Sequence, residues 1–206
     1  LTQRQIVTVM VGLMLGMFLA SLDQTIVSTS IYTIANDLDG LSLQAWATTS
    51  YLITSTVSTP LYGKLSDIFG RRPLYLIAIV IFLAGSLYAG SVHSMTELAL
   101  ARGVQGLGAG GLLALALTII GDIVSLKDRA KYQGYFMSVF GISSVLGPVV
   151  GGAFAGSSTI LGFDGWRWVF FINLPIGLAA LAVVFLFLHL PAKHAKQKID
   201  YWGAAA

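Results

Sequence analysis

Residues 74–92 read LYLIAIVIFLAGSLYAGSV, a run of 19 residues without a charged side chain. A helix needs about 20 predominantly apolar residues to cross the hydrocarbon core of a bilayer. The pair Arg71 and Arg72 precedes the run, and the first acidic residue after it is Glu97. Charges that flank an apolar run of this length without interrupting it predict a membrane-spanning helix.

The rest of the chain repeats this pattern. Its 206 residues are 56% hydrophobic and only 10% charged, with a mean hydropathy of +0.81, whereas a soluble domain carries roughly a quarter charged residues. Apolar stretches of spanning length lie at 6–34, 45–66, 74–92, 96–120, 135–155 and 168–190, and a further one begins at 201–206. The sequence therefore predicts an all-α integral membrane protein with six spans.

Several kinds of site are excluded by the residue types present. The chain has no cysteine and three scattered histidines, so we expect neither a disulfide nor a metal site. The glycine-rich run 106–111 has the spacing of a dinucleotide-binding turn, but it lies inside a span, where that motif has no preceding strand. We expect it to pack helices. With no Walker-type loop either, we expect no cofactor and no enzymatic activity.

Basic residues gather in alternate connections between the spans. They are Arg4; Lys64, Arg71 and Arg72; Lys127, Arg129 and Lys131; and Lys193, Lys196 and Lys198. The other connections carry mainly acidic residues, so this is a topology signal and not a nucleic-acid surface. Because cytoplasmic loops are enriched in Lys and Arg, both ends of the six-span unit are expected in the cytoplasm. We divide the chain into a six-helix domain, 1–192, and a linker with the start of a seventh helix, 193–206.

Two ionisable residues lie inside the predicted spans, Asp23 in the first and Arg102 in the fourth. A charged side chain at the bilayer centre costs about 2.5–3.5 kcal/mol on insertion scales, so such residues are functional candidates that face the bundle interior or a cavity. Three interpretations are open: an ion pair that only holds two helices together, a carboxylate that takes up and releases a proton, or a counter-ion for a cationic substrate. The amides of Gln24 and Gln105 join them as candidate coupling or substrate residues.

Small, hydroxyl-bearing and aromatic residues indicate how the spans are arranged. Glycines spaced four apart let helices approach closely in lipid, and such pairs are Gly12 with Gly16, Gly106 with Gly110, and Gly147 with Gly151. The hydroxyl-rich span 45–66 either bonds back to its own carbonyls or lines a wet cavity, and the sequence leaves both open. Indole rings suit the membrane boundary, which is the position expected for Trp46, Trp166 and Trp168.

Five segments resemble motifs of one transporter family. Residues 63–74, GKLSDIFGRRPL, resemble the loop after the second helix of the major facilitator superfamily, and residues 98–110, LALARGVQGLGAG, resemble its fourth-helix motif. Residues 141–152, GISSVLGPVVGG, resemble its antiporter motif in the fifth helix. Residues 22–27, LDQTIV, and 166–175, WRWVFFINLP, are similar to segments of the drug:H⁺ antiporters with fourteen helices.

The resemblance implies roles for two of these segments. A latch at the cytoplasmic face is implied for Gly63, Asp67, Gly70, Arg71 and Arg72, with Asp122 completing it and Arg129 as a further member. A seal against the other half of the transporter, favouring export, is implied for Gly147, Pro148, Gly151 and Gly152. In one departure, Ser30-Ile31-Tyr32 replace an Ala-Leu-Pro-type triplet, which removes a proline expected near the outer end of the first helix.

We therefore predict the six-helix N-terminal domain of a major facilitator, built as two inverted three-helix repeats, 6–92 and 96–190. The expected function is export of small amphipathic compounds, cationic ones among them, in exchange for protons by alternating access. The proton gradient is the expected energy source, a bacterial cytoplasmic membrane the expected location, and a C-terminal half missing from this chain the expected partner. The alternatives are a facilitator or exporter of a lipid, sugar or metabolite, and a non-transporting six-helix subunit or sensor.

Overall fold

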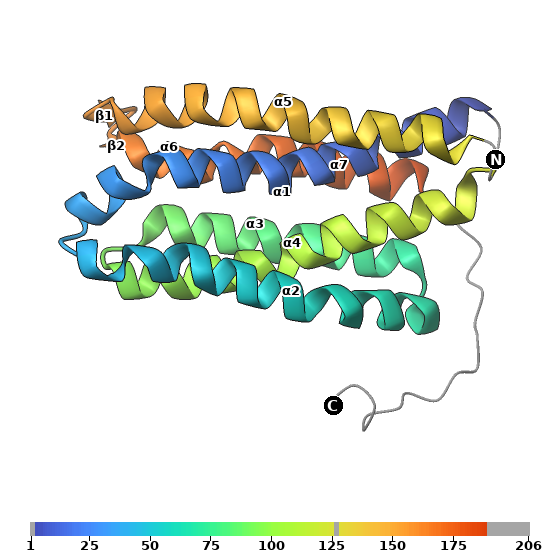
Figure 1. The fold of residues 1–206 in the computed structure, drawn as a ribbon, viewed down its shortest axis with the longest axis horizontal. Helices are drawn as coiled ribbons and strands as arrows, with labels where there is room; N and C mark the ends of the chain where they lie inside the picture. Colours follow the sequence, from blue (N-terminus) through green and yellow to red (C-terminus); the bar gives the residue numbers. More distant parts are fainter. Residues whose placement is uncertain (1–2, 126–127, 189–206) are drawn as a thin grey trace.

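The computed structural model describes residues 3–125 and 128–188, and their helices form six rods that run alternately in opposite directions (Figure 1). The helices are α1 (Gln3–Asp37), α2 (Gln44–Phe69), α3 (Arg71–Ser91), α4 (Met95–Ile123), α5 (Arg129–Ala155), α6 (Trp168–Phe171) and α7 (Asn173–Phe187). Short 3-10 turns lie at η1 (Leu41–Leu43) and η2 (Gly165–Arg167). The predicted all-α fold is confirmed. The predicted linker and seventh-helix start, 193–206, lie outside the described residues.

One small sheet adds to the predicted fold. Strands β1 (Thr159–Ile160) and β2 (Phe163–Asp164) pair antiparallel in the connection between α5 and α6. The two residues between the strands, Leu161 and Gly162, both have positive φ, which matches the twist of a two-residue hairpin turn. Nothing in the sequence analysis predicted this hairpin.

Local sequence accounts for where the helices begin and end. Gly70 alone separates α2 from α3 and has φ +95°, a conformation that glycine adopts without steric cost. Pro73 lies in the first turn of α3, where an N–H has no helical partner to lose. At the start of α4, the Ser94 hydroxyl accepts the Glu97 N–H at 3.3 Å, and the Glu97 carboxylate accepts the His93 N–H at 2.8 Å. This reciprocal pair caps the helix.

The sixth rod consists of two helical pieces, α6 and α7. Pro175 has no N–H, so the carbonyl of Phe171, four residues earlier, lacks its usual helical partner. Ile172, between the pieces, keeps helical dihedral angles of φ −61° and ψ −24°. The predicted span 168–190 is therefore interrupted in its hydrogen bonding without a change of backbone conformation, and Asn173 becomes the first residue of α7.

Helix contacts follow a twofold pattern. Helices α1 and α4 contact each other at the centre; α4 packs against α2 and α3, and α1 packs against α5 and α7. Helices α3 and α7 also contact each other. Exchanging α1, α2 and α3 for α4, α5 and α7 turns the α4 contacts with α2 and α3 into the α1 contacts with α5 and α7, and leaves the α1–α4 and α3–α7 pairs unchanged. The contacts are therefore those of the two inverted three-helix repeats.

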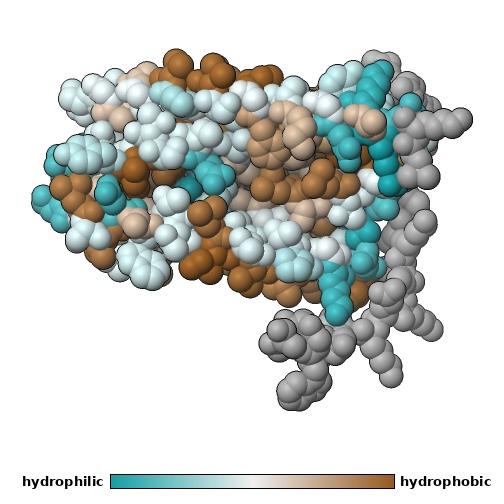
Figure 2. Space-filling view, viewed as in Figure 1, coloured by the Kyte–Doolittle hydropathy of each residue, from teal (hydrophilic) through white to brown (hydrophobic). Residues whose placement is uncertain are grey.

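By length and composition, five helical segments of the described chain can cross a membrane: Gln5–Asp37, Arg71–Ser91, Met95–Ile123, Arg129–Ala155 and Gly165–Phe187. Helix α2 has the length, with 26 residues, but its Ser and Thr side chains lower its hydropathy. It nevertheless lies alongside the other rods in Figure 1. Figure 2 shows apolar residues along the flank of the bundle and hydrophilic residues gathered near its ends, as a bilayer requires.

The hydroxyl groups of α2 mostly bond to carbonyls of their own helix. Thr54 donates to the Ser50 carbonyl at 2.9 Å, and Thr59 donates to the Ser55 carbonyl at 2.8 Å. Ser50 differs, because its hydroxyl donates across the interface to the Ala99 carbonyl of α4 at 2.8 Å. Of the two interpretations left open by the sequence, bonding back to the helix describes most of these hydroxyls.

Glycines on α4 let both of its neighbours approach its backbone. A Cβ at Gly110 would lie 2.5 Å from the Ser55 carbonyl oxygen of α2, and one at Gly106 would overlap the same helix. On the α3 side, a Cβ at Gly108 would lie 2.6 Å from the Ala78 carbonyl oxygen. The glycine-rich run therefore packs helices, as predicted.

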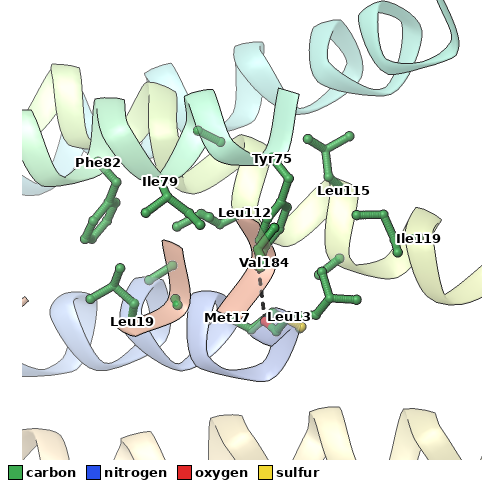
Figure 3. Packing of buried hydrophobic residues seen from close by; sticks show 14 of the residues in the cluster. Leu13, Met17, Leu19, Tyr75, Ile79, Phe82, Leu112, Leu115, Ile119 and Val184 are labelled. Atoms are coloured by element: carbon green, nitrogen blue, oxygen red, sulfur yellow. Dashed lines mark hydrogen bonds between the residues drawn. The ribbon is translucent and has the colours of Figure 1, made fainter. Parts of the chain in front are cut away.

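Buried apolar side chains form two clusters along the bundle. Figure 3 shows part of the larger cluster, which joins Leu13, Met17 and Leu19 of α1, Tyr75, Ile79 and Phe82 of α3, Leu112, Leu115 and Ile119 of α4, and Val184 of α7. In this view the Tyr75 hydroxyl donates to the Leu13 carbonyl, at 3.2 Å. The second cluster includes Leu22, Ile26, Ala89, Ala101 and Phe170. The site described next lies between the two.

We expect Gly108→Ala to destabilise the domain and Gly103→Ala to leave its stability nearly unchanged. Both glycines lie on α4, but a Cβ at Gly103 would be 3.8 Å from its nearest neighbour, an ordinary contact, whereas at Gly108 it would press on the α3 backbone. Overpacking of this kind costs about 1–3 kcal/mol. Each variant is heated in detergent, and the temperature at which half of the monodisperse protein has been lost is its unfolding midpoint. Equal midpoints for the two variants would contradict the close α3–α4 approach.

Candidate functional site

A layer of buried polar side chains crosses the bundle between the two apolar clusters. Ser86 illustrates its position, since Leu83, one turn earlier on α3, belongs to the larger cluster and Ala89, one turn later, belongs to the second. The members of this polar layer, each no more than 1% exposed, are Asp23 of α1, Ser86 of α3, Arg102 and Gln105 of α4, and Asn173 of α7.

Asp23 accepts hydrogen bonds on both of its carboxylate oxygens. Its Oδ2 forms an ion pair with Nη1 of Arg102. Its Oδ1 accepts from Nε2 of Gln105 at 3.1 Å and from Nδ2 of Asn173 at 2.7 Å. Three donors therefore surround the carboxyl group, which is the arrangement that an ionised acid requires.

Arg102 is held on several sides. Its Nη1 also donates to Oε1 of Gln105 at 2.8 Å, and its Nε donates to the Ala47 carbonyl of α2 at 3.4 Å. The guanidinium carbon lies 4.2 Å from the centre of the Tyr51 ring, a cation–π contact that contributes about 2 kcal/mol when desolvated. The Tyr51 hydroxyl donates to the Ala20 carbonyl at 3.4 Å. Arg102 thereby links α1, α2 and α4.

Ser86 joins the two amides of the layer. Its Oγ accepts from Nε2 of Gln105 at 2.7 Å and from Nδ2 of Asn173 at 3.2 Å. The side-chain oxygen of Asn173 is buried and has no hydrogen-bond partner in the described part of the chain. The layer is thus fully connected around the carboxylate and has one open acceptor at its α7 side.

The structure shows that Asp23 and Arg102 touch, which the sequence left open. With 0% and 1% of their surface exposed, neither can be reached by a proton or a substrate unless the surrounding helices separate. Gln105, predicted with them, lies in the layer. Gln24 is exposed on another face of α1 and does not join it. A role for Gln24 in binding substrate therefore stays a separate prediction.

Sequence reasoning missed three members of this environment, Ser86, Asn173 and Tyr51. Asn173 carried a usable signal, because it is the one side-chain amide in the apolar stretch 168–187, where a buried polar group must find a partner. Ser86 and Tyr51 carried little signal, since serine and tyrosine occur throughout the spans. Only the packing of α2 and α3 onto α4 brings these two into place.

A second charged cluster lies where α2, α3 and α4 meet, at the α2–α3 end of the bundle. Nη1 of Arg71 pairs with Asp67 at 2.6 Å, and Nε of Arg71 donates to Asp122 at 3.1 Å. Nη1 also contacts Oγ of Ser66 and, at 3.5 Å, the Gly63 carbonyl. We call Asp67, Arg71 and Asp122 the latch cluster. The two acidic side chains are 45% and 50% exposed, so each pair contributes at most about 1 kcal/mol, which suits a contact that forms and breaks.

Two residues predicted for the latch contact other partners. Nη2 of Arg72 donates to the Phe185 carbonyl of α7 at 2.6 Å, and its guanidinium lies 5.4 Å from the centre of the Phe185 ring. Arg72 is therefore directed toward α7, and its predicted place beside the acidic residues is wrong. Nη2 of Arg129 donates to the Gly121 carbonyl at 2.6 Å, where a cation complements the C-terminal end of α4. Arg129 thus borders the latch cluster through the residue next to Asp122.

Only some glycines of the fifth-helix motif, Gly147 and Gly151, contact α1. A Cβ at Gly147 would overlap the Thr25 side chain, whose hydroxyl donates to the Ser143 carbonyl at 3.0 Å. Gly151 also lies close to α1, since a Cβ there would be 2.9 Å from the Ile26 carbonyl oxygen, and its own carbonyl accepts the Ser30 hydroxyl at 3.1 Å. These contacts hold α5 against α1 at the level of the polar layer and just beyond it.

Pro148 and Gly152 lie on the other side of α5. Both are exposed in the described chain, and a Cβ at Gly152 would meet nothing within 4 Å. Gly152 therefore packs against no neighbour in the described chain, because the helix turns that residue away from α1. Their predicted place in a seal against another domain stays a prediction.

The triplet Ser30-Ile31-Tyr32 lies within an unbroken helix. Without a proline at this point, α1 continues through the triplet to Asp37. Ser30 is buried and bonds to α5, whereas Tyr32 is 66% exposed. Where the family has a proline, α1 is therefore a regular helix, and Ser30 joins it to α5 through a hydrogen bond.

The opposite end of the bundle is fixed by Trp166 and Arg167. Trp166 is only 3% exposed, and its indole N–H donates to the Asp37 carboxylate at 2.7 Å. Nη1 of Arg167 donates to two carbonyls at the end of α3, that of Gly90 in the last turn at 3.0 Å and that of Val92 just after the helix at 2.8 Å. Its guanidinium lies 4.4 Å from the centre of the Trp166 ring. The expectation of a boundary anchor is wrong for Trp166, which ties α1 to the start of the sixth rod. Trp46, 56% exposed, remains compatible with it.

Comparison with known proteins identifies the family and the fold. A profile of the family described as Major Facilitator Superfamily matches residues 13–205. The chain is 43% identical over 190 residues to the "Multidrug transporter protein MdtP" of Bacillus subtilis (strain 168), covering 92% of this chain and 34% of that protein. It is 43% identical over 185 residues to the "Efflux pump dotC" of Dothistroma septosporum, covering 90% of this chain and 31% of that pump. The chain thus spans about a third of the length of the curated relatives it matches.

Solved structures share the fold at low sequence identity. The proton:xylose symporter XylE of E. coli superposes with a TM-score of 0.79 at 20% identity, covering 90% of this chain and 45% of XylE. A bacterial homologue of the human lysosomal transporter Spinster gives a TM-score of 0.78 at 20% identity, covering 98% of this chain and 47% of that structure. At this identity the likeness concerns the fold alone, and it places the chain on one half of each transporter.

We expect Arg102→Met to destabilise the folded domain by about 3–5 kcal/mol, because it leaves the Asp23 carboxylate buried without its cation. Adding Asp23→Leu to the same chain should restore much of that loss, since the pair is then replaced by apolar groups. Arg72→Met, which removes an arginine that caps a helix end, serves as the control and should cost far less. Denaturation midpoints of the single and double variants measure the coupling. A double variant as unstable as the sum of the two single effects would show that the pair is not coupled.

Proposed function

Because the chain belongs to the major facilitator superfamily, we propose that it forms the six-helix half of a transporter that exports small amphipathic compounds, cationic ones among them, in exchange for protons. The observation that carries this proposal is the sealed Asp23–Arg102 pair, a carboxylate and its cation held away from water among five of the six helical rods. An ion pair that only joined two helices could lie at the bundle surface and would not need to be enclosed by five rods.

The geometry supports a coupling of proton binding to helix movement. In a medium of low dielectric, an ionised carboxylate is favoured beside a cation and disfavoured once the cation leaves. Since the pair is inaccessible in this conformation, a proton reaches Asp23 only when helices around the pair separate. Protonation then removes the attraction that holds α1 to α4, so the separated conformation persists until the proton is released. Proton binding to Asp23 and separation of the helices therefore occur together.

The energy source in this proposal is the proton gradient, with no cofactor. An exchange that moves net charge draws about 2.3 kcal/mol per charge from each 100 mV of membrane potential, in addition to the pH difference. The six-helix domain lies in a cytoplasmic membrane, taken here as bacterial, with its basic ends inside. A second, C-terminal half completes the transport pathway, since curated relatives are about three times as long as this chain.

Export of drug-like compounds is favoured by the relatives at more than 40% identity, which are named as a multidrug transporter and an efflux pump. The sugar symporter shares only the fold, so a sugar or metabolite substrate has less support. A direct counter-ion role for Asp23 also has less support, because the carboxylate is fully enclosed and its bonding positions are occupied by protein donors. We therefore favour the proton as the species that Asp23 handles.

Asp23→Asn is expected to abolish proton-coupled export, because asparagine keeps the shape of the side chain but cannot take up and release a proton. The variant leaves the buried Arg102 without its anion, so it should be folded but less stable than the parent protein, and transport is compared at equal amounts of folded protein. The assay is substrate-induced proton movement in proteoliposomes that contain the complete protein. Asp39→Asn is the matched control: Asp39 is exposed, and its φ of 48° is one that asparagine tolerates. Undiminished proton exchange in Asp23→Asn would refute the assignment, and export independent of pH and potential would refute proton coupling altogether.

Asp67→Asn is expected to lower the turnover rate by about fivefold, the factor that ~1 kcal/mol produces, and to leave substrate affinity nearly unchanged. Asp67 bonds to Arg71 at the end of the bundle, far along α2 from the polar layer, so it affects the conformational step and not the binding step. Transport rates over a range of substrate concentrations separate kcat from KM. Lys64→Gln, an exposed charge on the same helix, is the control. A change confined to KM would contradict a latch.

A further inference from the structure

The side-chain amide of Asn173 is hydrogen-bonded on one side only. Its Nδ2 donates to Oδ1 of Asp23 at 2.7 Å and to Oγ of Ser86 at 3.2 Å. Its Oδ1 is buried and has no partner among the described residues. A buried polar atom left without a partner is costly, so its presence beside the ionisable group of the domain calls for a physical reason.

The present arrangement around Asp23 suits the ionised acid only. A protonated carboxyl group carries an O–H donor, which needs an acceptor. Gln105 and Asn173 both direct N–H groups at Oδ1, and Arg102 directs one at Oδ2. A proton added to either oxygen would therefore face a donor. Taking up a proton requires that at least one of the three neighbours turn or leave.

Asn173 is the neighbour that can turn without leaving Asp23. Rotation by about 180° about its terminal torsion exchanges Oδ1 with Nδ2, which are nearly equal in size. Gln105 is prevented from the same rotation, because its Oε1 accepts from Arg102 at 2.8 Å and the exchange would set two donors against each other. Arg102 itself has no acceptor atom to offer.

Ser86 is compatible with both orientations of Asn173. In the present state its Oγ accepts from Asn173 and from Gln105. A serine hydroxyl also carries one donor and rotates to suit its surroundings. When the Asn173 oxygen turns toward this side, the Ser86 hydroxyl can donate to it while still accepting from Gln105.

Few charged or titratable groups of the described chain face Asp23. Helix α4 contributes Arg102, and α2 contributes the phenol of Tyr51, whose hydroxyl is bonded to the Ala20 carbonyl. Helices α3 and α7 contribute the neutral side chains of Ser86 and Asn173, and α5 and α6 contribute no ionisable side chain at this level. The hydrogen bond of a protonated Asp23 O–H must therefore be accepted by a neutral group.

We propose, building on the function proposed above, that Asn173 positions the proton on Asp23 by exchanging hydrogen-bonding roles. Its N–H groups bind the ionised carboxylate, and its oxygen accepts the O–H of the protonated acid, with the Ser86 hydroxyl reorienting in step. Asn173 is thus a positioning residue that stabilises both protonation states of Asp23. The unpartnered oxygen of the ionised state is the acceptor held ready for the protonated one.

The test is infrared difference spectroscopy of the complete protein in lipid, with asparagine labelled by ¹³C at the side-chain carbonyl and the pH varied. Asp23→Asn identifies the C=O band of the protonated acid, and Asn173→Leu identifies the Asn173 amide band. Asn173→Gln gives a second assignment if the leucine variant does not fold. As the acid band appears, the Asn173 band should move to lower wavenumber with the same pH midpoint, because its oxygen gains a hydrogen bond. Asn36, the other asparagine of this chain, is exposed and its band should stay in place.

Two serine variants provide a matched comparison. Ser86 and Ser143 are both fully buried, but Ser143 Oγ has no hydrogen-bond partner in the described chain and lies outside the polar layer. Ser86→Ala should shift the pH midpoint of the acid band, and Ser143→Ala should leave it unchanged. An acid band that titrates while the Asn173 band stays fixed would overturn this inference and leave the proposed function standing. Transport without any titration of Asp23 would overturn both.

Discussion

The ion pair between Asp23 and Arg102 is the interaction on which the arrangement of the bundle depends. Removing two charges from water costs several kcal/mol per ion unless hydrogen bonds replace the lost hydration. Here the replacements come from α2, α3, α4 and α7 around a carboxylate on α1. Apolar contacts alone would not fix the helices in register, because a lipid tail is as apolar as leucine. A slip of one helix by one turn would take a donor away from a buried charge, so the polar layer specifies a single register for five helical rods.

The α2–α4 interface connects this layer to the latch cluster. Arg102 and Asp122 lie on the same helix, about 30 Å apart at 1.5 Å per residue, and Tyr51 and Asp67 occupy the corresponding levels of α2. Between these levels, Gly106 and Gly110 bring the two backbones into direct contact, and the hydroxyls of Thr54 and Ser58 bond back to carbonyls of α2. Two helices joined this closely move as one body. Under the proposed function, this interface would be the route by which a change in the pair reaches the latch cluster, without a continuous chain of polar contacts.

Much of the fold was predictable, because in a membrane the sequence must show apolar length, flanking charge and glycine spacing directly. The helix ends at Gly70 and Ser94, the close contacts of the glycine-rich run and the meeting of Arg71 with Asp67 all follow from local rules. The site was only partly predictable. Asp23 and Arg102 are conspicuous because charge is rare inside a span, whereas Ser86 and Tyr51 become significant only when three helices have been packed together. Errors arose where the direction of a side chain had to be chosen: Arg72 and Trp166 each point to a side that spacing alone does not determine.

Helix α1 is the element through which protonation can affect anything outside the sealed layer. Asp23 faces inward with no exposed surface, while Gln24 and Ser28 on the same helix are exposed, and Thr25 ties α1 to α5 through the Ser143 carbonyl. A substrate and a proton therefore need not meet at one group. Under the proposed function, the charge state of Asp23 would set how tightly α1 is held to α4, and that attachment would set where the exposed face of α1 and the whole of α5 can lie. Because α5 has few contacts with the domain other than those to α1, it follows α1 with little resistance. In the proposed mechanism, the carboxylate would control a distant surface by holding or releasing a helix, and its enclosure would reserve that control for the proton.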